Sequence, residues 1–159
     1  MIGCEVTLED FDVSKDRGLL AQCHSLRREV FGEEYGSEEL VRVDDEDRNS
    51  WHIVARWIGD GSVIATCRLR SVHPYVKLEQ VAVRKGKYSF YDWRRRTIGH
   101  RLCRRAIELA GCLCSRQVLV TYSQLHVVKF YEQLGFVVAS DEFMDAGILH
   151  KVLLLDTYN

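Results

Sequence analysis

Apolar and polar positions follow two different periods along this chain, and each period predicts one kind of element. Residues 51–58 and 63–72 are apolar runs of strand length, separated by the turn-forming residues 59–62. This is the strongest hairpin pattern in the sequence. Between residues 14 and 31 the apolar side chains fall on one helical face, and Ser14 is the expected N-cap. The pattern therefore predicts a helix followed by a β-hairpin.

Further elements complete an alternating order of strands and helices. A buried strand at 76–83 leads into a helix at 97–109, which Gly111 is expected to end or bend, and Gly135 is expected to cap a later helix at 125–134. The other expected strands are residues 4–8, 117–122, 136–139 and 148–156. The resulting order, β-α-β-β-β-α-β-α-β-β, predicts a mixed sheet flanked by helices.

Composition places the chain among ordinary globular proteins. It has 159 residues, 47% hydrophobic and 28% charged, with a net charge of −1, which predicts one domain over residues 1–159 and argues against disorder and a chain-wide nucleic-acid surface. No run approaches the ~18 apolar residues of a membrane span, and no signal-peptide pattern opens the chain. The six cysteines form no C-x-x-C pair, so they are interpreted as reduced thiols of a cytoplasmic protein, with a disulfide or metal framework as the alternative.

Charge is unevenly distributed in spite of the small net value. Residues 84–105 hold nine Lys or Arg against one acid, Asp92, where the expected strand leads into the expected helix. A helix N-terminus with neighbouring cations is a suitable place for a phosphate. Residues 33–47 hold eight acids against one base, and they are either a solvated loop or a lid that presents carboxylates to a cationic substrate.

Three stretches, in this order and spacing, resemble the GNAT superfamily of acyl-CoA N-acyltransferases. Residues 78–83 (LEQVAV) are similar to the family's central strand, residues 94–100 (RRRTIGH) to its pyrophosphate loop R/Q-x-x-G-x-G/A, and residues 130–136 (FYEQLGF) to the F-Y-x-x-x-G-F after its late helix. Residues 123–136 and 142–155 resemble the ElaA-like branch in register. The resemblance implies an α+β fold of the three-layer α/β type, with a mixed, mostly antiparallel central sheet of about six or seven strands flanked by helices.

The resemblance also implies a site for acetyl-CoA as co-substrate, and no metal. Main-chain groups of Val81, Ala82 and Val83 would bind the pantetheine arm, and His126 is assigned to the same cofactor site. Backbone N–H groups and cations of the pyrophosphate loop would bind the diphosphate, and its residues are Arg94, Arg95, Arg96, Thr97, Ile98, Gly99 and His100. Thr97 stands where the family has a glycine, and its Cβ is expected to narrow the approach to phosphate. Candidates for the adenosine 3′-phosphate are Arg84, Lys85 and Lys87.

Two residues carry the chemistry that the resemblance implies. Tyr131 occupies the family's position for the general acid, because a phenol is protonated at neutral pH and can return a proton to a leaving thiolate. Glu79 on the central strand is the expected general base, provided that it faces the cleft, and strand alternation places it on the face of Val81 and Val83. Other side chains compete for the role of base: Glu34, His52, His126 and His150.

Two functions from different classes remain open from the sequence. The first is an N-acetyltransferase that moves an acetyl group from acetyl-CoA to a primary amine of a small molecule or peptide in a ternary complex. A fainter likeness to acyl-homoserine-lactone synthases leaves the acyl length open. The second is a non-enzymatic module that binds nucleic acid through the basic and aromatic residues of 84–105. The expected partners are acetyl-CoA and a small amine, with no nucleic acid and no membrane, and a homodimer is compatible with the sequence but not derivable from it.

Overall fold

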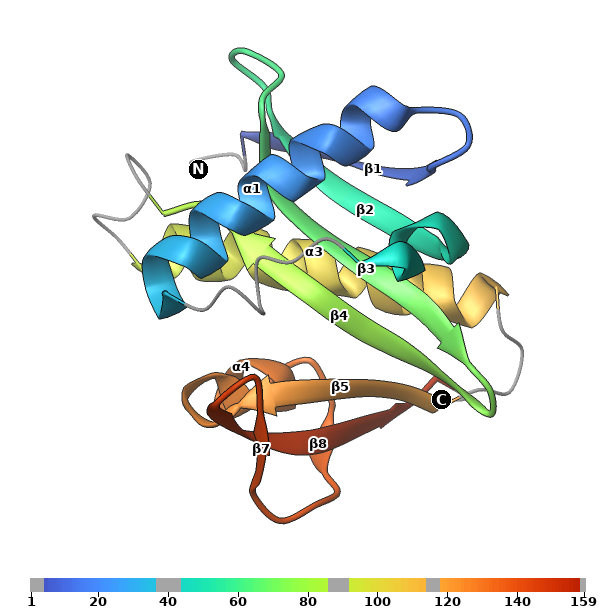
Figure 1. Ribbon diagram of the computed structural model, residues 1–159, viewed down its shortest axis with the longest axis vertical. Coiled ribbons are helices and arrows are strands. Elements are labelled where there is room, and N and C mark those ends of the chain that lie inside the picture. Colours follow the sequence, from blue (N-terminus) through green and yellow to red (C-terminus); the bar gives the residue numbers. More distant parts are fainter. Residues whose placement is uncertain (1–4, 37–43, 86–91, 114–117, 158–159) are drawn as a thin grey trace.

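The computed structural model describes residues 5–36, 44–85, 92–113 and 118–157, with backbone alone at 33–35 and 92–94. Within these residues eight strands form one sheet (Figure 1). The strands are β1 (Val6–Asp12), β2 (Ser50–Trp57), β3 (Val63–Val72), β4 (Tyr75–Val83), β5 (Val118–Gln124), β6 (Val137–Val138), β7 (Phe143–Asp145) and β8 (Ile148–Asp156). Their order is β1-β2-β3-β4-β5-β8-β6, with β7 also paired to β8, and only β4 and β5 are parallel neighbours.

Helices cover both faces of the N-terminal half of this sheet. In Figure 1, α1 lies in front of β2 to β4 and α3 lies behind them. The helical segments are α1 (Arg17–Tyr35), η1 (Asp45–Asn49), α3 (Asp92–Leu113), η3 (Leu125–Val127) and α4 (Val128–Glu132). The expected α+β fold with a mostly antiparallel central sheet and flanking helices is confirmed, and β7 is an additional strand that the sequence pattern did not predict.

Several helix boundaries differ from the expected ones. The side chain of Asp16, not Ser14, caps α1, because its carboxylate accepts a 2.9 Å hydrogen bond from the N–H group three residues later. Helix α1 continues beyond residue 31 and ends at Gly36, whose φ of 57° is the left-handed conformation that glycine adopts without strain. Gly111 does not end α3, since the helix runs to Leu113.

Alternating side chains of the central strands build two separate cores. Ile53 and Ala55 of β2 pack into the core on the α3 side, where they meet fully buried residues such as Leu102. Val54, between them, belongs to the core on the α1 side together with Leu26. Burying one such side chain stabilises the fold by roughly 1.5–3 kcal/mol, so the two cores fix β2, β3 and β4 between the helices.

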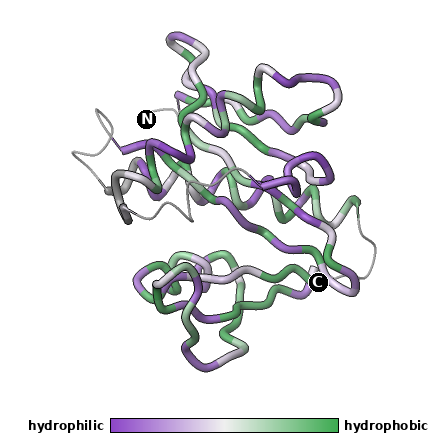
Figure 2. Tube along the Cα trace, viewed as in Figure 1, coloured by the Kyte–Doolittle hydropathy of each residue, from purple (hydrophilic) through white to green (hydrophobic). Residues whose placement is uncertain are grey.

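The C-terminal strands form a second, more apolar part of the sheet. Figure 2 shows β5 and β8 as mostly hydrophobic, next to the short helical segment that joins β5 to β6. The expected helix at 125–134 is shorter than predicted and consists of η3 and α4. Gly135 follows α4 with a φ of 100°, a positive value that suits a glycine after the end of a helix.

The described cysteines are free thiols, and three of them fill the core. Cys23, Cys67 and Cys103 are buried and Cys112 is exposed, whereas Cys4 and Cys114 lie outside the described residues. Burial raises the pKa of all three buried thiols, that of Cys103 to about 12, which makes them poor nucleophiles and poor metal ligands. Among the described residues no group of three potential ligands is arranged to hold a metal ion, and no helix is both long and apolar enough to cross a membrane.

Candidate active site

Strands β4 and β5 pair only over their first residues and then part. The parallel register runs from Tyr75 opposite Val118 to Lys77 opposite Val120. One residue further along, the hydroxyl of Thr121 in β5 donates a 3.0 Å hydrogen bond to the carbonyl of Leu78 in β4. The edge of β4 beyond this point therefore faces a space rather than a neighbouring strand.

Strand β4 contains a β-bulge in the part that has left β5. The register between β3 and β4 shifts between Thr66 and Arg68, and Gln80 adopts a φ of 56°, a conformation that is rare outside glycine. A bulge bends its strand and redirects the side chains on either side of it. Glu79, Gln80 and Val81, at this bulge, line the same cavity, as do Lys77 and Leu78 before it.

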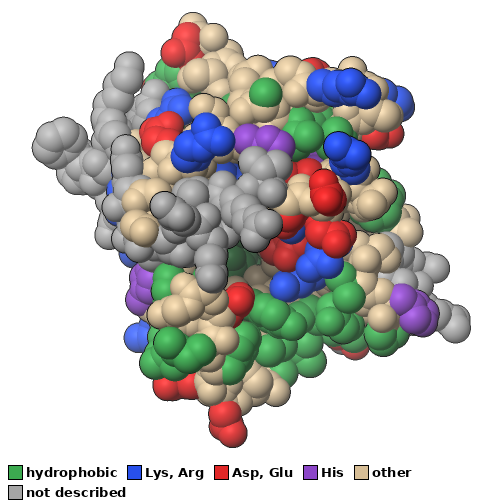
Figure 3. Space-filling model, in the orientation of Figure 1, with side chains coloured by type: hydrophobic (Ala, Val, Ile, Leu, Met, Phe, Trp, Pro, Cys, Tyr) green, Lys and Arg blue, Asp and Glu red, His purple; other side chains and the backbone are tan. Residues whose placement is uncertain are grey.

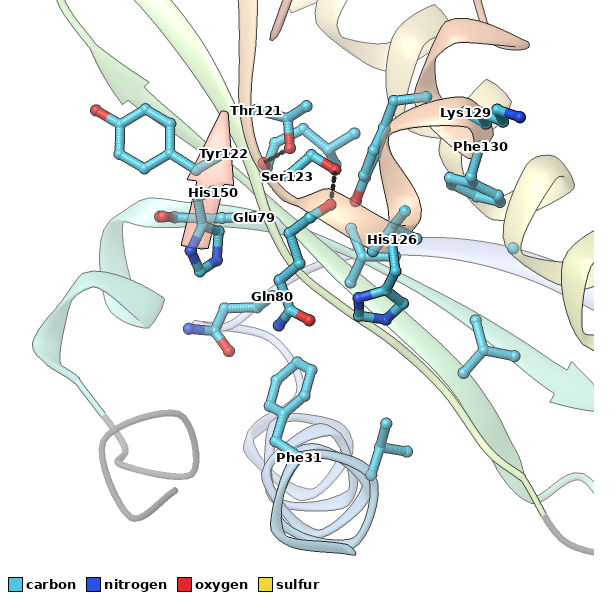
Figure 4. A pocket seen from close by; sticks show the side chains of 18 of the residues that line it. Phe31, Glu79, Gln80, Thr121, Tyr122, Ser123, His126, Lys129, Phe130 and His150 are labelled. Atoms are coloured by element: carbon cyan, nitrogen blue, oxygen red, sulfur yellow. Dashed lines mark hydrogen bonds between the residues drawn. The ribbon is translucent and has the colours of Figure 1, made fainter. Parts of the chain in front are cut away.

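The cavity has a volume of about 600 Å³ and lies between the parted strands. In Figure 4, Glu79, Tyr122 and His150 lie at one end of it, and His126, Lys129 and Phe130 lie at the other. Phe31 reaches the cavity from α1. In Figure 3 charged side chains of both signs gather in the hollow between the two halves of the molecule, beside an apolar surface over β5 and β8.

The three residues expected to bind pantetheine divide between the cavity and the core. Val81 and Val83 line the cavity, whereas Ala82 is 1% exposed and packs in the core on the α1 side. The carbonyl of Val83 already accepts a 3.0 Å hydrogen bond from Nε of Arg95. A ligand that bonds to this edge of β4 would use the main-chain groups before that carbonyl.

The loop expected before the helix is helical at residues 94–96, whereas the helix expected from residue 97 is confirmed. All of residues 94–100 belong to α3, which begins at Asp92 and so starts five residues earlier than expected. Only the first turn of a helix has N–H groups without intrahelical partners, so the N–H groups of Thr97, Ile98, Gly99 and His100 are committed within α3. The sequence favours this extension, because arginine is a good helix former and Thr97 replaces a glycine that would open the turn. The backbone groups available to an anion are displaced toward the helix start.

The side chains of this segment point in different directions. Arg95 and Arg96 line the cavity, Thr97 is exposed and Ile98 is buried in the core, and the side chain of Arg94 lies outside the described residues.

Gly99 and His100 pack closely against Phe130 of α4. A methyl group at Gly99 would lie 3.2 Å from two atoms of the Phe130 ring, and the His100 ring stacks on it with centroids 4.6 Å apart. Burial and then the charge of Arg104 lower the pKa of His100, which favours its neutral form. Gly99 therefore serves the close approach of α3 to α4, at the wall of the cavity.

Most of the cations around this helix have partners in the protein. Arg84, a candidate for the 3′-phosphate, forms a two-point ion pair with Glu29 at 3.0 Å, and Arg105 forms another with Asp10. Arg101 donates to the carbonyl of Val6. Lys85 is exposed and engaged in a further interaction, and Lys87 lies outside the described residues. These contacts argue against a continuous cationic surface for nucleic acid. The aromatic residues of that prediction, Tyr88, Phe90, Tyr91 and Trp93, lie where no side chain is described.

Tyr131, the general acid expected from the sequence, lies in the cavity wall. It is 7% exposed and packs edge-on between Phe130, 5.1 Å away, and Phe136, 5.6 Å away, as ring centroids. This packing holds the phenol in one orientation. His126 is exposed on η3 and lines the same cavity.

Glu79 reaches the cavity, but its carboxylate is held by three cations. Oε1 accepts hydrogen bonds from Arg68, at 2.8 Å, and from Arg70, and Nζ of Lys77 lies 3.4 Å from Oε2. Burial alone would raise the pKa of Glu79, but the hydrogen bond from Arg70 and the charges of Arg68 and Lys77 lower it below its usual value. This geometry argues against Glu79 as the general base.

A buried ion cluster behind Glu79 was not predicted. Arg68 is 2% exposed and joins Glu79 to Asp44 and Asp47, and Asp47 in turn accepts from Arg27. Part of the acidic stretch 33–47 is therefore neither a solvated loop nor a lid, since two of its carboxylates are neutralised by arginine. Residues 37–43 lie outside the described part of the chain. The feature of the sequence that indicates this cluster is Arg68, an arginine between two apolar residues of a buried strand.

The other candidates for the base occupy different surroundings. His52 is fully buried away from the cavity and donates to the carbonyl of Asp47, and burial lowers its pKa. The side chain of Glu34 lies outside the described residues. His150 is 5% exposed and lines the cavity.

The fold, with its parted strands, matches that of several solved structures. A crystal structure of an acyl-CoA N-acyltransferase from Pseudomonas aeruginosa matches with a TM-score of 0.80 at 22% identity, over 94% of this chain and 98% of that chain. Escherichia coli ElaA matches with a TM-score of 0.80 at 18% identity over 94% and 98% of the two chains. The acyl-homoserine-lactone synthase LasI matches with a TM-score of 0.75 at 17% identity over 96% and 90%.

Sequence comparisons assign the family. Residues 20–136 match the model of the acetyltransferase (GNAT) family. A protein of Bacillus subtilis (strain 168) described as the uncharacterized N-acetyltransferase YjcF is 29% identical over 146 residues, which is 91% of this chain and 97% of that protein. The chain belongs to the GNAT family and is an N-acetyltransferase, which confirms the family expected from its sequence motifs.

Proposed function

We propose that this protein transfers an acetyl group from acetyl-CoA to a primary amine of a small molecule or peptide, by direct attack in a ternary complex. The observation that supports the proposal is the cavity between β4 and β5, which brings the free edge of β4, the first turns of α3 and Tyr131 together. Effective transfer needs the thioester and the amine held in one space. The two ends of the cavity provide separate places for them.

Acetyl-CoA is assigned to the end formed by α3 and α4. The backbone of Val81 lies on the edge of β4 that bounds this end, and it would bind the pantetheine arm and polarise the thioester carbonyl. Arg96 and Lys129 line the same end and would contact phosphate, as would backbone N–H groups of the first turn of α3, which have no partner within a helix. His126 lies beside them and is assigned to the same cofactor.

The proposed reaction is direct attack of the amine on the thioester. The neutral amine attacks the carbonyl carbon, a C–N bond forms, and the electron pair of the carbonyl moves to oxygen. When the tetrahedral intermediate collapses the C–S bond breaks, and the thiolate takes the proton of the Tyr131 phenol. The proton lost by the new amide nitrogen restores the phenol through solvent.

Buried, free thiols at Cys23 and Cys103 support the proposal of a cytoplasmic protein, where cysteines stay reduced.

The test is release of CoA thiol from acetyl-CoA in the presence of a panel of primary amines. Tyr131→Phe is expected to lower kcat by about 10²–10³-fold with unchanged affinity for acetyl-CoA, because it removes one proton donor and no volume. Tyr75→Phe, the same change away from the cavity, serves as the control. Full activity of Tyr131→Phe would refute the acid assignment, and transfer from octanoyl-CoA but not acetyl-CoA would assign a longer acyl group.

A further inference from the structure

His150 lies at the end of the cavity opposite to the one assigned to acetyl-CoA, where the acceptor amine would bind. It comes from β8, where it stands opposite Gln124 of β5 on one side and Phe143 of β7 on the other. It is 5% exposed, yet it lines the cavity, and Figure 4 shows its ring near Glu79 and Tyr122. A buried polar ring at a cavity wall is available to a ligand and shielded from bulk water.

One hydrogen bond fixes which ring nitrogen carries the hydrogen. Nδ1 of His150 lies 2.7 Å from the carbonyl oxygen of Ile148. A carbonyl oxygen only accepts hydrogen bonds, so Nδ1 is the donor. In the neutral ring Nε2 then has the free lone pair, at the end of the ring that lies away from the backbone.

Aromatic packing holds the ring in this orientation. Phe143 lies against His150 with centroids 6.0 Å apart, and Tyr122 meets Phe143 edge-on at 5.3 Å. Nζ of Lys77 lies 3.7 Å over the Tyr122 ring and fixes the outer side of the group. The lone pair of Nε2 is therefore presented in one direction, as general-base catalysis requires.

We propose that Nε2 of His150 is the general base that takes the proton from the acceptor amine, and this assignment rests on the acetyltransferase function proposed above. The ammonium group of the arriving amine transfers one proton to Nε2, which makes the nitrogen nucleophilic for attack on the thioester. The imidazolium then releases this proton to solvent, so the ring returns to its neutral form. Glu79 stays ionised beside it, paired with Arg68, Arg70 and Lys77.

The partners of Glu79 and His150 explain why His150, and not Glu79, is assigned as the base. Each oxygen of Glu79 already faces cations, Arg68 and Arg70 at Oε1 and Lys77 at Oε2, so a proton gained by Glu79 would disrupt several ion pairs. The single fixed bond of His150 uses Nδ1 and leaves Nε2 available. The titratable and charged groups that face the cavity with His150 are Lys77, Glu79, Arg95, Arg96, Tyr122, His126, Lys129, Tyr131 and Asp145.

His150→Asn tests the assignment, because the asparagine amide can still donate to the Ile148 carbonyl while Nε2 is removed. With the best primary amine of the panel, kcat/KM is expected to fall by about 10²–10³-fold. The acidic limb of its pH profile is expected to disappear, since that limb reports protonation of the base. Affinity for acetyl-CoA, measured by calorimetry, is expected to stay within about twofold of wild type because the cofactor occupies the other end of the cavity.

Two histidines give matched controls for the same substitution. His126→Asn changes the other cavity histidine and is expected to retain the acidic limb, and His73→Asn, exposed at the β3–β4 turn, is expected to leave kcat/KM unchanged. NMR of the protein labelled with ¹⁵N-histidine supplies a second measurement. It should show that Nδ1, and not Nε2, carries the hydrogen in the neutral ring of His150.

The outcomes separate the two proposals. If wild type acetylates an amine and His150→Asn keeps both kcat/KM and the acidic limb, the assignment of His150 is overturned while the proposed function stands. Loss of the acidic limb in His126→Asn instead, or an Nε2–H form of His150, overturns it too. If wild type binds no acetyl-CoA and acetylates no amine in the panel, the proposed function fails and the assignment of His150 fails with it.

Discussion

Asp47→Asn is expected to destabilise this protein strongly, because Asp47 lies at the centre of the buried ion cluster. Its side chain is 3% exposed, and Nη1 of Arg27 lies 3.0 Å from both of its oxygens. Nη1 of Arg68 lies 2.9 Å away, and Nε2 of His24 lies 2.6 Å away. Burial alone would raise the pKa of Asp47, but Arg27, His24 and Arg68 together lower it to about 2.

The magnitude follows from this pKa and from the charges left behind. A decrease from 3.8 to about 2 corresponds to roughly 2.5 kcal/mol of folding free energy at neutral pH. Removing one partner of a buried ion pair costs about 3–5 kcal/mol, since the remaining charges stay buried. Asparagine keeps the volume and one acceptor, so we expect a loss of about 3 kcal/mol. For a domain of this size that is roughly 6–12 °C in Tm.

Urea unfolding of wild type and variant from pH 7 to pH 3 is the assay. A carboxylate with a lowered pKa in the folded state stabilises fully above its unfolded pKa, near ~4, and loses this contribution as the pH falls toward 2. The difference between the two proteins should therefore shrink below pH 4. Asp10→Asn is the matched control, since Asp10 also pairs with an arginine, Arg105, but at the surface, and should cost less than about 1 kcal/mol. Equal losses for Asp47→Asn and Asp10→Asn at pH 7 would refute the reasoning.

Three further changes test the walls of the cavity. Arg96→Ala should weaken acetyl-CoA binding about tenfold in calorimetry, whereas Arg104→Ala, further along α3, should leave it unchanged, and the reverse order would contradict the placement of the phosphates. Gly99→Ala places a methyl group 3.2 Å from the Phe130 ring and should lower the free energy of unfolding by about 1–3 kcal/mol, measured as a decrease in Tm. An unchanged Tm would mean that the Phe130 ring moves freely. Thr121→Val leaves a buried carbonyl of β4 without its donor and should cost about 1–2 kcal/mol in urea unfolding, a cost that a bridging water would abolish.

The β2–β3 hairpin and the family motifs were accessible from the sequence because their signals are local. The turn from Gly59 to Ser62 separates two apolar runs, and the structure places a turn there between two antiparallel strands. β7 has only three residues and is specified by pairing with β8, so no local pattern predicts it. The start of α3 was misplaced because the likeness to a glycine loop outweighed the helix propensity of residues 94–96.

The division of charge within the site could not be read from the sequence, because it depends on contacts between distant segments. Arg68 lies between Cys67 and Leu69, and all three are buried in β3, which is a visible anomaly in a strand. Its partners Asp47 and Glu79 come from two other parts of the chain, 21 and 11 residues away. The bulge at Gln80 likewise arises from the pairing of β4 with β3.

Calorimetric titration with acetyl-CoA at two salt concentrations tests the central claim most directly. A cavity between β4 and β5 that binds the thioester predicts saturable one-to-one binding at low micromolar concentration, weakened only modestly by salt because few ion pairs are made. Absence of saturable binding would contradict acetyl-CoA as the co-substrate. Affinity for single-stranded oligonucleotide that falls steeply with salt, without acetyl-CoA binding, would indicate a nucleic-acid surface instead.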